Sequence, residues 1–129
     1  MTTAATLTHA IHWFEIPVAD IDRAQRFYEA TLGAPLRREA MGPQTQLAVL
    51  PYQPGQGVGG CLMAAPGMAP AAGGSLVYLA VGPTLDDALA RLPAAGRITT
   101  PKVTLPDGMG VFAHIEDSEG NRVGLHALA

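Results

Sequence analysis

Several side chains with the chemistry of a catalytic or metal-binding group fall in segments that predict strands, and the four of greatest interest are Glu15, Cys61, His114 and His126. Glu15 and His126 are the most interesting, because a carboxylate near an imidazole can orient it, stabilise its charge, or take a proton itself when burial raises its pKa. Such a pair is also common as a structural ion pair or a hydrogen bond to backbone. Whether the four meet depends on the elements that carry them.

The segment at residues 9–18 predicts a strand with two different faces, because apolar and other residues alternate along it. One face is apolar and carries Phe14, Ile16 and Val18. The other carries Trp13 and Glu15, and a carboxylate on it indicates that this face is not ordinary core.

A helix is predicted after this strand, and three further strands follow. Asp20 is a good N-cap and Gly33 stands where a C-terminal glycine belongs. The later strands are expected at about 36–40, 45–50 and 58–64. Residues 65–74, APGMAPAAGG, have the composition of a linker.

The same order of elements restarts after the linker. A strand is predicted at 75–81, and a second helix begins at Thr84, with Asp87 placed for a capping box. We expect Gly96 to close this helix, although Pro93 should kink it or end it early. Strands at about 97–103, 110–116 and 122–128 complete a second unit, 63 residues after the first.

Composition limits the class of protein. A chain of 129 residues that is 48% hydrophobic and 15% charged predicts one folded domain. Its net charge of −3 and its lone lysine, Lys102, argue against a nucleic-acid partner. Cys61 is the sole cysteine, so no intramolecular disulfide forms. We see no membrane span and no targeting segment, and we expect a cytoplasmic location.

Two sequence runs carry a resemblance to a known family: FEIPVADIDRAQRFYEATLG at 14–33 and EDSEGNRVGLH at 116–126. With the duplicated element order, the chain resembles the vicinal oxygen chelate superfamily of glyoxalases, bleomycin resistance proteins and extradiol dioxygenases. The resemblance implies an α+β fold in one domain, 1–129, of two tandem βαβββ modules, at about 8–64 and 75–128. Their curled mixed sheet would enclose a cup-shaped cavity.

The resemblance also implies where a metal would bind, since members that use one place ligands on the first and last strand of each half. Those positions are Trp13, Cys61, Leu76 and Gly124 in this sequence. Divalent metals of this kind prefer imidazole nitrogen and carboxylate oxygen. Trp, Leu and Gly offer no such donor, so we expect no metal site of the usual kind and no cofactor.

Alternation along the strands predicts which residues line the cup instead. The expected ligand-binding residues are Trp13, Cys61, Met63, Tyr78, Phe112 and His114. Glu15 and His126 are the candidate catalytic pair, and Arg122 either pairs with an anionic ligand group or lies solvated at a strand end. An apolar, aromatic pocket with a few polar groups is typical of small-molecule sites.

Three functions remain open at this point. The first is a metal-free module that binds a small organic molecule. The second is an isomerase, lyase or dioxygenase with a displaced divalent metal, held by Glu15, His114 and His126. The third is a metal-free enzyme that uses Glu15 and His126 for proton transfer. A homodimer is plausible, because a small chain with open sheet edges invites pairing.

Overall fold

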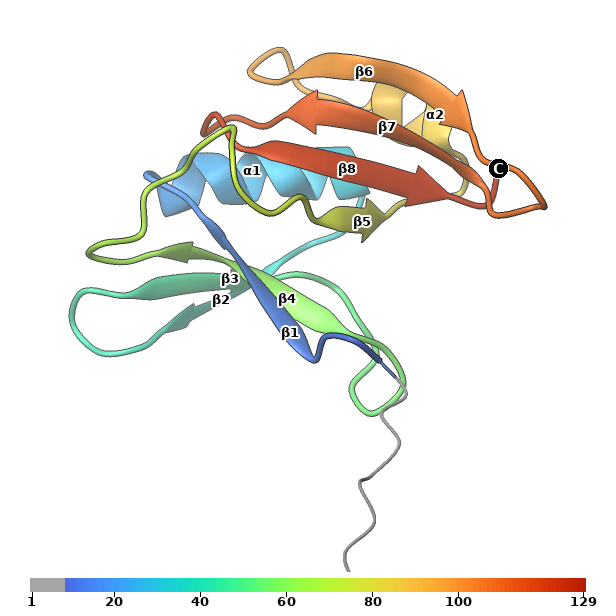
Figure 1. The fold of residues 1–129 in the computed structure, drawn as a ribbon. Helices are drawn as coiled ribbons and strands as arrows, with labels where there is room; N and C mark the ends of the chain where they lie inside the picture. The colour runs from blue at the N-terminus through green and yellow to red at the C-terminus, as the bar shows by residue number, and fades with distance from the viewer. Residues whose placement is uncertain (1–8) are drawn as a thin grey trace, which may run out of the picture.

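The computed structural model describes residues 9–129, so the expected start of the first module at residue 8 lies outside the described residues. The elements in chain order are β1 (Trp13–Pro17), α1 (Ile21–Leu32), β2 (Arg37–Ala40), β3 (Gln46–Val49), β4 (Gly59–Ala64), β5 (Tyr78–Ala80), α2 (Leu85–Ala90), β6 (Arg97–Thr104), β7 (Val111–Glu116) and β8 (Arg122–Ala127). The order is βαβββ twice, which confirms the predicted α+β class and its two modules (Figure 1).

The strands form two separate four-stranded sheets with the same internal order. They run β1-β4-β3-β2 in the first sheet and β5-β8-β7-β6 in the second. In each, the first and last strands of the module are parallel and the other pairs are antiparallel. Glu15 pairs with Cys61, and Tyr78 pairs with Gly124, so the register repeats with the 63-residue offset.

Short side-chain contacts set the ends of both helices. Asp20 caps α1 by accepting from the Arg23 amide at 3.0 Å, and Gly33 ends it in the left-handed conformation at φ 69°. Thr84 and Asp87 form the predicted capping box on α2. The expected end at Gly96 is wrong, because α2 stops at Ala90 ahead of the proline at position 93, whose ring and missing N–H prevent continuation.

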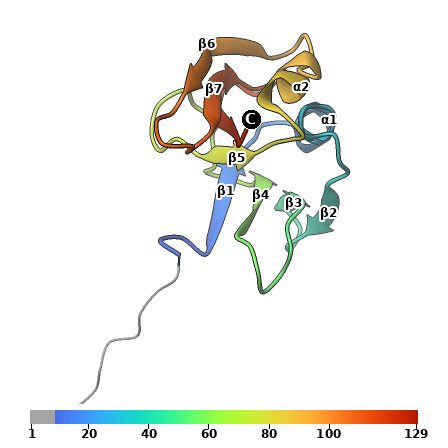
Figure 2. The same ribbon diagram turned by 90° about the vertical axis from the view of Figure 1, so that its right-hand side faces the viewer.

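One apolar core serves both modules and lies on the helix side of the two sheets. Figures 1 and 2 show α1 between the sheets, with α2 beside it. The fully buried side chains there come from both halves and include Val18, Tyr28, Leu62, Leu85, Ile115 and Leu125. Because the core occupies this side, the residues predicted to face a ligand project from the opposite faces of the sheets.

The turn between β7 and β8 binds the second module to the first. The Glu119 carboxylate accepts from the backbone amides of Ala19 and Asp20 at 3.0 and 2.9 Å, and pairs with Arg23 at 2.6 Å. Its side chain is fully buried, whereas that of Arg23 is 48% exposed. The anion therefore lies at the start of α1, where free amides favour negative charge.

Two further side chains of the same turn reach into the first module. The buried Asp117 accepts from the Tyr28 hydroxyl at 2.5 Å, and Asn121 donates to the Pro17 carbonyl at 2.6 Å. Asn121 also accepts from the Ala71 amide at 3.0 Å, which fixes the segment between β4 and β5. The turn thus fixes how the two sheets sit against each other.

Among the described residues, no helix is long and apolar enough to cross a membrane.

Candidate functional site

The candidates of the first module lie on the outward face of its sheet. Trp13 is 41% exposed and meets Tyr52 edge to face at 5.9 Å between ring centroids. Glu15 lies two residues along β1 and is exposed too. This agrees with the predicted alternation, because Phe14 between them is partly buried and Ile16 and Val18 beyond them are buried in the core.

Cys61 and Met63 belong to a small second apolar cluster, together with Leu47 and Val49. Cys61 is fully buried, and burial raises the pKa of its thiol to about 11, with a contribution from the nearby Glu15 carboxylate. A thiol of this kind is inert at neutral pH. Cys61 therefore acts as a buried packing residue of this cluster beneath the exposed side chains of the first sheet.

The candidates of the second module form an aromatic cluster on the outward face of the other sheet. The ring centroid of Tyr78 lies 5.7 Å from that of Phe112 and 5.5 Å from that of His114, and the last two rings are 5.3 Å apart. Tyr78 is 48% exposed. Three planar rings thus meet at the surface of the second sheet.

Hydrogen bonds on both edges of the His114 ring fix its tautomer. The Arg122 guanidinium donates to Nδ1 at 3.2 Å, and Nε2 lies 2.7 Å from the Tyr78 hydroxyl. A guanidinium can only donate, so Nδ1 accepts and the proton of the neutral ring sits on Nε2. Burial lowers the pKa of His114, and the positive charge of Arg122 lowers it further, which favours this neutral form.

Gly124 explains how Tyr78 reaches His114 across the strand between them. Both residues pair with Gly124, Tyr78 from β5 and His114 from β7. A Cβ at Gly124 would overlap the Tyr78 ring atoms Cγ, Cδ1 and Cε1, so the ring lies directly over this glycine. The absence of a side chain at this position opens the path for the phenol.

His126 is hydrogen-bonded within its own module. Its Nε2 donates to the Met109 carbonyl at 2.7 Å, because a carbonyl only accepts. No hydrogen bond or ion pair joins Glu15 to His126 within residues 9–129. The expectation that these two point into one region stays a prediction.

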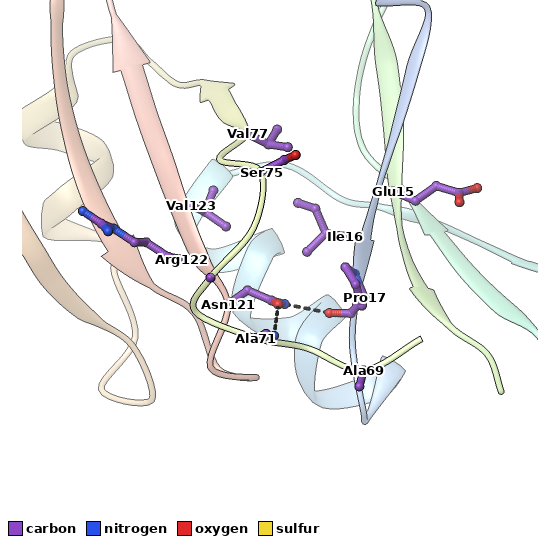
Figure 3. A pocket seen from close by; sticks show the side chains of 11 residues that line it. Glu15, Ile16, Pro17, Ala69, Ala71, Ser75, Val77, Asn121, Arg122 and Val123 are labelled. Carbon is purple, nitrogen blue, oxygen red and sulfur yellow. Dashed lines mark hydrogen bonds between the residues drawn. The ribbon is translucent and has the colours of Figure 1, made fainter. Parts of the chain in front are cut away.

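Figure 3 gives a close view of the space between the modules. Ile16 and Val123 point into this cavity of about 220 Å³, whereas the charged ends of Glu15 and Arg122 point away from each other on its two sides.

A larger cavity of about 650 Å³ lies between the first strands of the two modules. Trp13 and Tyr78 both line it, together with mainly apolar residues such as Phe14, Leu32 and Leu50. Its size and lining are typical of sites that hold a small organic molecule. Alternation along the strands placed both aromatic residues on the face that was expected to line a cup.

The residues at the implied metal positions do not fit a divalent ion. Trp13, Leu76 and Gly124 lack a suitable donor, and Cys61 is a buried thiol held in its protonated form. Over Gly124 the space is already filled by the Tyr78 ring. Among the described residues, 9–129, no group of three or more His, Cys, Asp or Glu side chains is placed to hold a metal.

Sequence reasoning undervalued Arg122 and missed the part played by Gly124. Arg122 is exposed at the start of β8, in agreement with a solvated strand end, and it also donates to His114, which the sequence did not indicate. The signal lay in the alternation of β8, which puts Arg122, Gly124 and His126 on one face.

Comparisons with known proteins agree with this fold. The model of the Glyoxalase/Bleomycin resistance protein/Dioxygenase superfamily matches residues 10–125. A comparison with curated protein sequences finds no match.

Among solved structures, an integron cassette protein from V. cholerae is 18% identical, with a TM-score of 0.66 over 98% of this chain and 100% of that one. The fosfomycin resistance protein FosX from Listeria monocytogenes is 14% identical, with a TM-score of 0.60 over 97% of this chain and 94% of that one.

A glyoxalase I mutant from Zea mays is 22% identical, with a TM-score of 0.60 over 90% of this chain, which spans only 45% of the maize chain. At these identities the structural likeness establishes the fold alone, whereas the family model covers most of the sequence. The chain therefore belongs to the Glyoxalase/Bleomycin resistance protein/Dioxygenase superfamily.

Proposed function

We propose that this protein binds a small organic molecule on its aromatic surfaces without the divalent metal of its family. The observation that carries this proposal is the position of the Tyr78 ring over Gly124, where the resemblance places a metal ligand. An aromatic ring there offers stacking and one hydroxyl in place of a coordinating oxygen. The site then selects its ligand by shape and hydrogen bonding.

The proposed ligand-binding residues are Trp13, Tyr78, Phe112 and His114, with Cys61 and Met63 supporting the first of them from below. Trp13 and Tyr78 line the 650 Å³ cavity, which is large enough for a molecule of one or two rings. Phe112 and His114 extend the aromatic surface beside it.

A second copy of the chain is the partner that we propose, because the two sheets of this small domain end in edge strands, such as β2 and β6, that invite pairing. Light scattering measures the oligomeric state directly, and a monomer across the working concentrations would overturn this part of the proposal.

Trp13 provides the test of ligand binding, because it is the only tryptophan in the chain and lines the cavity. We expect small planar molecules to change its fluorescence saturably and to raise the melting temperature, since a ligand that binds only the folded state stabilises it. Trp13→Phe removes the fluorophore and part of the cavity wall, so it should lose the optical signal and reduce the ligand-induced rise in melting temperature. If no member of a broad set of small organic molecules shifts the melting temperature, the proposal is wrong.

A further inference from the structure

The hydrogen bonds around His114 leave two donors directed at a ligand. Nε2–H of the ring donates to the Tyr78 oxygen, so the hydroxyl proton of Tyr78 is not used for this bond and is free to donate outward. On the other edge of the ring, Arg122 donates one N–H to Nδ1, and its remaining N–H groups and its positive charge are available to a ligand. The imidazole thus holds a neutral donor on one side and a cation on the other.

The charges around this group favour an anion. Arg122 forms no ion pair with any of residues 9–129. The neighbouring carboxylate, Glu116, lies opposite Arg122 in the β7–β8 pairing but is bound to Arg97 at 2.5 Å. With that pair neutral overall, the face carries one unshared positive charge beside the rings of Tyr78, Phe112 and His114. Arginine in such a place suits a planar carboxylate, which it can bind with two parallel hydrogen bonds.

We propose that Tyr78, His114 and Arg122 form a binding site for a planar organic carboxylate. The carboxylate pairs with Arg122, the flat body of the ligand lies across the aromatic cluster, and a second oxygen at its far end accepts from the Tyr78 hydroxyl. This inference rests on the proposed function and deepens it, because it names the chemical class of the ligand. His114 acts as the positioning residue that sets the two donors apart.

Three matched probes separate the parts of this inference. The first, 4-methoxybenzoate, has the charge, the ring and the second oxygen. The second, 4-methoxybenzamide, lacks the charge, and the third, 4-ethylbenzoate, lacks the second oxygen. Titration calorimetry on the full chain should give the tightest binding for the first, with the amide about tenfold weaker or more, because a hydrogen bond to a charged group contributes about 1.5–3 kcal/mol.

Two variants test the named donors. Arg122→Gln should weaken both carboxylates about tenfold and leave the amide unchanged. Tyr78→Phe keeps the ring and should weaken 4-methoxybenzoate about threefold to tenfold while leaving 4-ethylbenzoate unchanged. Arg37→Gln removes an exposed arginine of the other sheet and should change nothing. Both donor side chains are exposed, so all three variants should melt within a few degrees of the natural protein.

The outcomes are decisive for each claim. Equal affinity for carboxylate and amide, or unchanged affinity in Arg122→Gln, overturns the carboxylate assignment while leaving the proposed function intact. Equal losses of both carboxylates in Tyr78→Phe overturn the assignment of the second oxygen. No saturable binding of any probe overturns the inference as a whole, and the proposed function is then judged separately by the broad small-molecule screen.

Discussion

The ring of Tyr78 lies over the Cα of Gly124 on the neighbouring strand and reaches His114 on the strand beyond. Gly124 holds one of the positions where the resemblance places a metal ligand. A side chain there and the present position of the Tyr78 ring are sterically incompatible. A coordinating side chain at position 124 would exclude the Tyr78 ring from its present place. The glycine found there instead leaves room for an aromatic surface with a hydroxyl group.

Substitution of Gly124 by alanine should expel the Tyr78 ring and break its hydrogen bond to His114. Because Tyr78 is on the surface, its ring can rotate away, and the expected loss of stability is about 1 kcal/mol, the usual contribution of one hydrogen bond. Chemical denaturation measures this loss. In a Tyr78→Ala background Gly124→Ala should cost much less, because no ring remains to be displaced. An equal cost in both backgrounds would show that the two residues do not compete for this space.

Loss of the Tyr28 hydroxyl should destabilise the whole domain. Asp117 is buried and accepts from Tyr28 and from the amides of Glu119 and Asn121, the last two at 2.8 Å each. Burial raises the pKa of Tyr28 and keeps its hydroxyl protonated as a donor. Tyr28→Phe should therefore lower the free energy of unfolding by about 1.5–3 kcal/mol, the range for hydrogen bonds to charged groups. Tyr52→Phe is the matched control at an exposed tyrosine, and similar losses in both variants would contradict this account.

Acid should weaken the link between the modules at Glu119. Burial alone raises the pKa of this carboxyl, but Arg23, Ser118 and the amides of Ala19 and Asp20 outweigh it and lower the pKa from 4.5 to about 2. A folded-state pKa below the unfolded one means that this contribution is fully present above about pH 4.5 and is lost as the pH falls towards 2.

Denaturation at a series of pH values between 6 and about 2 measures this dependence. The natural protein should lose stability through this range, and Glu119→Gln should be less stable at pH 6 with a smaller further loss on acidification. If the variant keeps the full acid-induced loss, Glu119 is not responsible for it. Glu39→Gln, on the exposed β2, serves as the control carboxylate.

Cys61 should resist alkylation in the folded protein. Its pKa of about 11 and its complete burial leave almost no thiolate exposed at neutral pH. Iodoacetamide should therefore label it at least about a hundredfold more slowly in the native protein than in urea, as followed by mass spectrometry. Rapid native labelling would mean that the cluster with Leu47, Val49 and Met63 opens readily and that Cys61 is available to a ligand.

Much of the fold could be predicted because local signals agree with it. The Asp20 and Thr84 caps, the Gly33 end and the alternation of β1 and β7 each have a short-range physical cause, and all are present in the structure. The length of α2 was harder, since Gly96 and Pro93 give competing signals and the proline prevails. The first strands are shorter than predicted, at 13–17 and 78–80, because pairing to β4 and β8 sets their ends.

The sequence could predict which candidate residues share one face of a sheet, but not how the faces of the two sheets are placed relative to each other. Alternation identified Tyr78, Phe112 and His114 as neighbours on one face, because the pairing of adjacent strands follows from their order. The relation of Glu15 to His126 depends instead on how the two sheets pack. That packing is set by the Glu119 and Asn121 contacts and by the shared core, which no local pattern encodes.

We propose that this chain binds an organic ligand without a divalent metal, and the metal content of the protein tests this proposal most directly. Elemental analysis of the purified protein should be combined with thermal melts in the presence and absence of Ni, Zn, Mn and Fe(II). We predict far less than one metal ion per chain and no metal-dependent rise in melting temperature. A near-stoichiometric metal, or a clear rise with one of these ions, would contradict the account and direct attention to the chemistry of a bound cation.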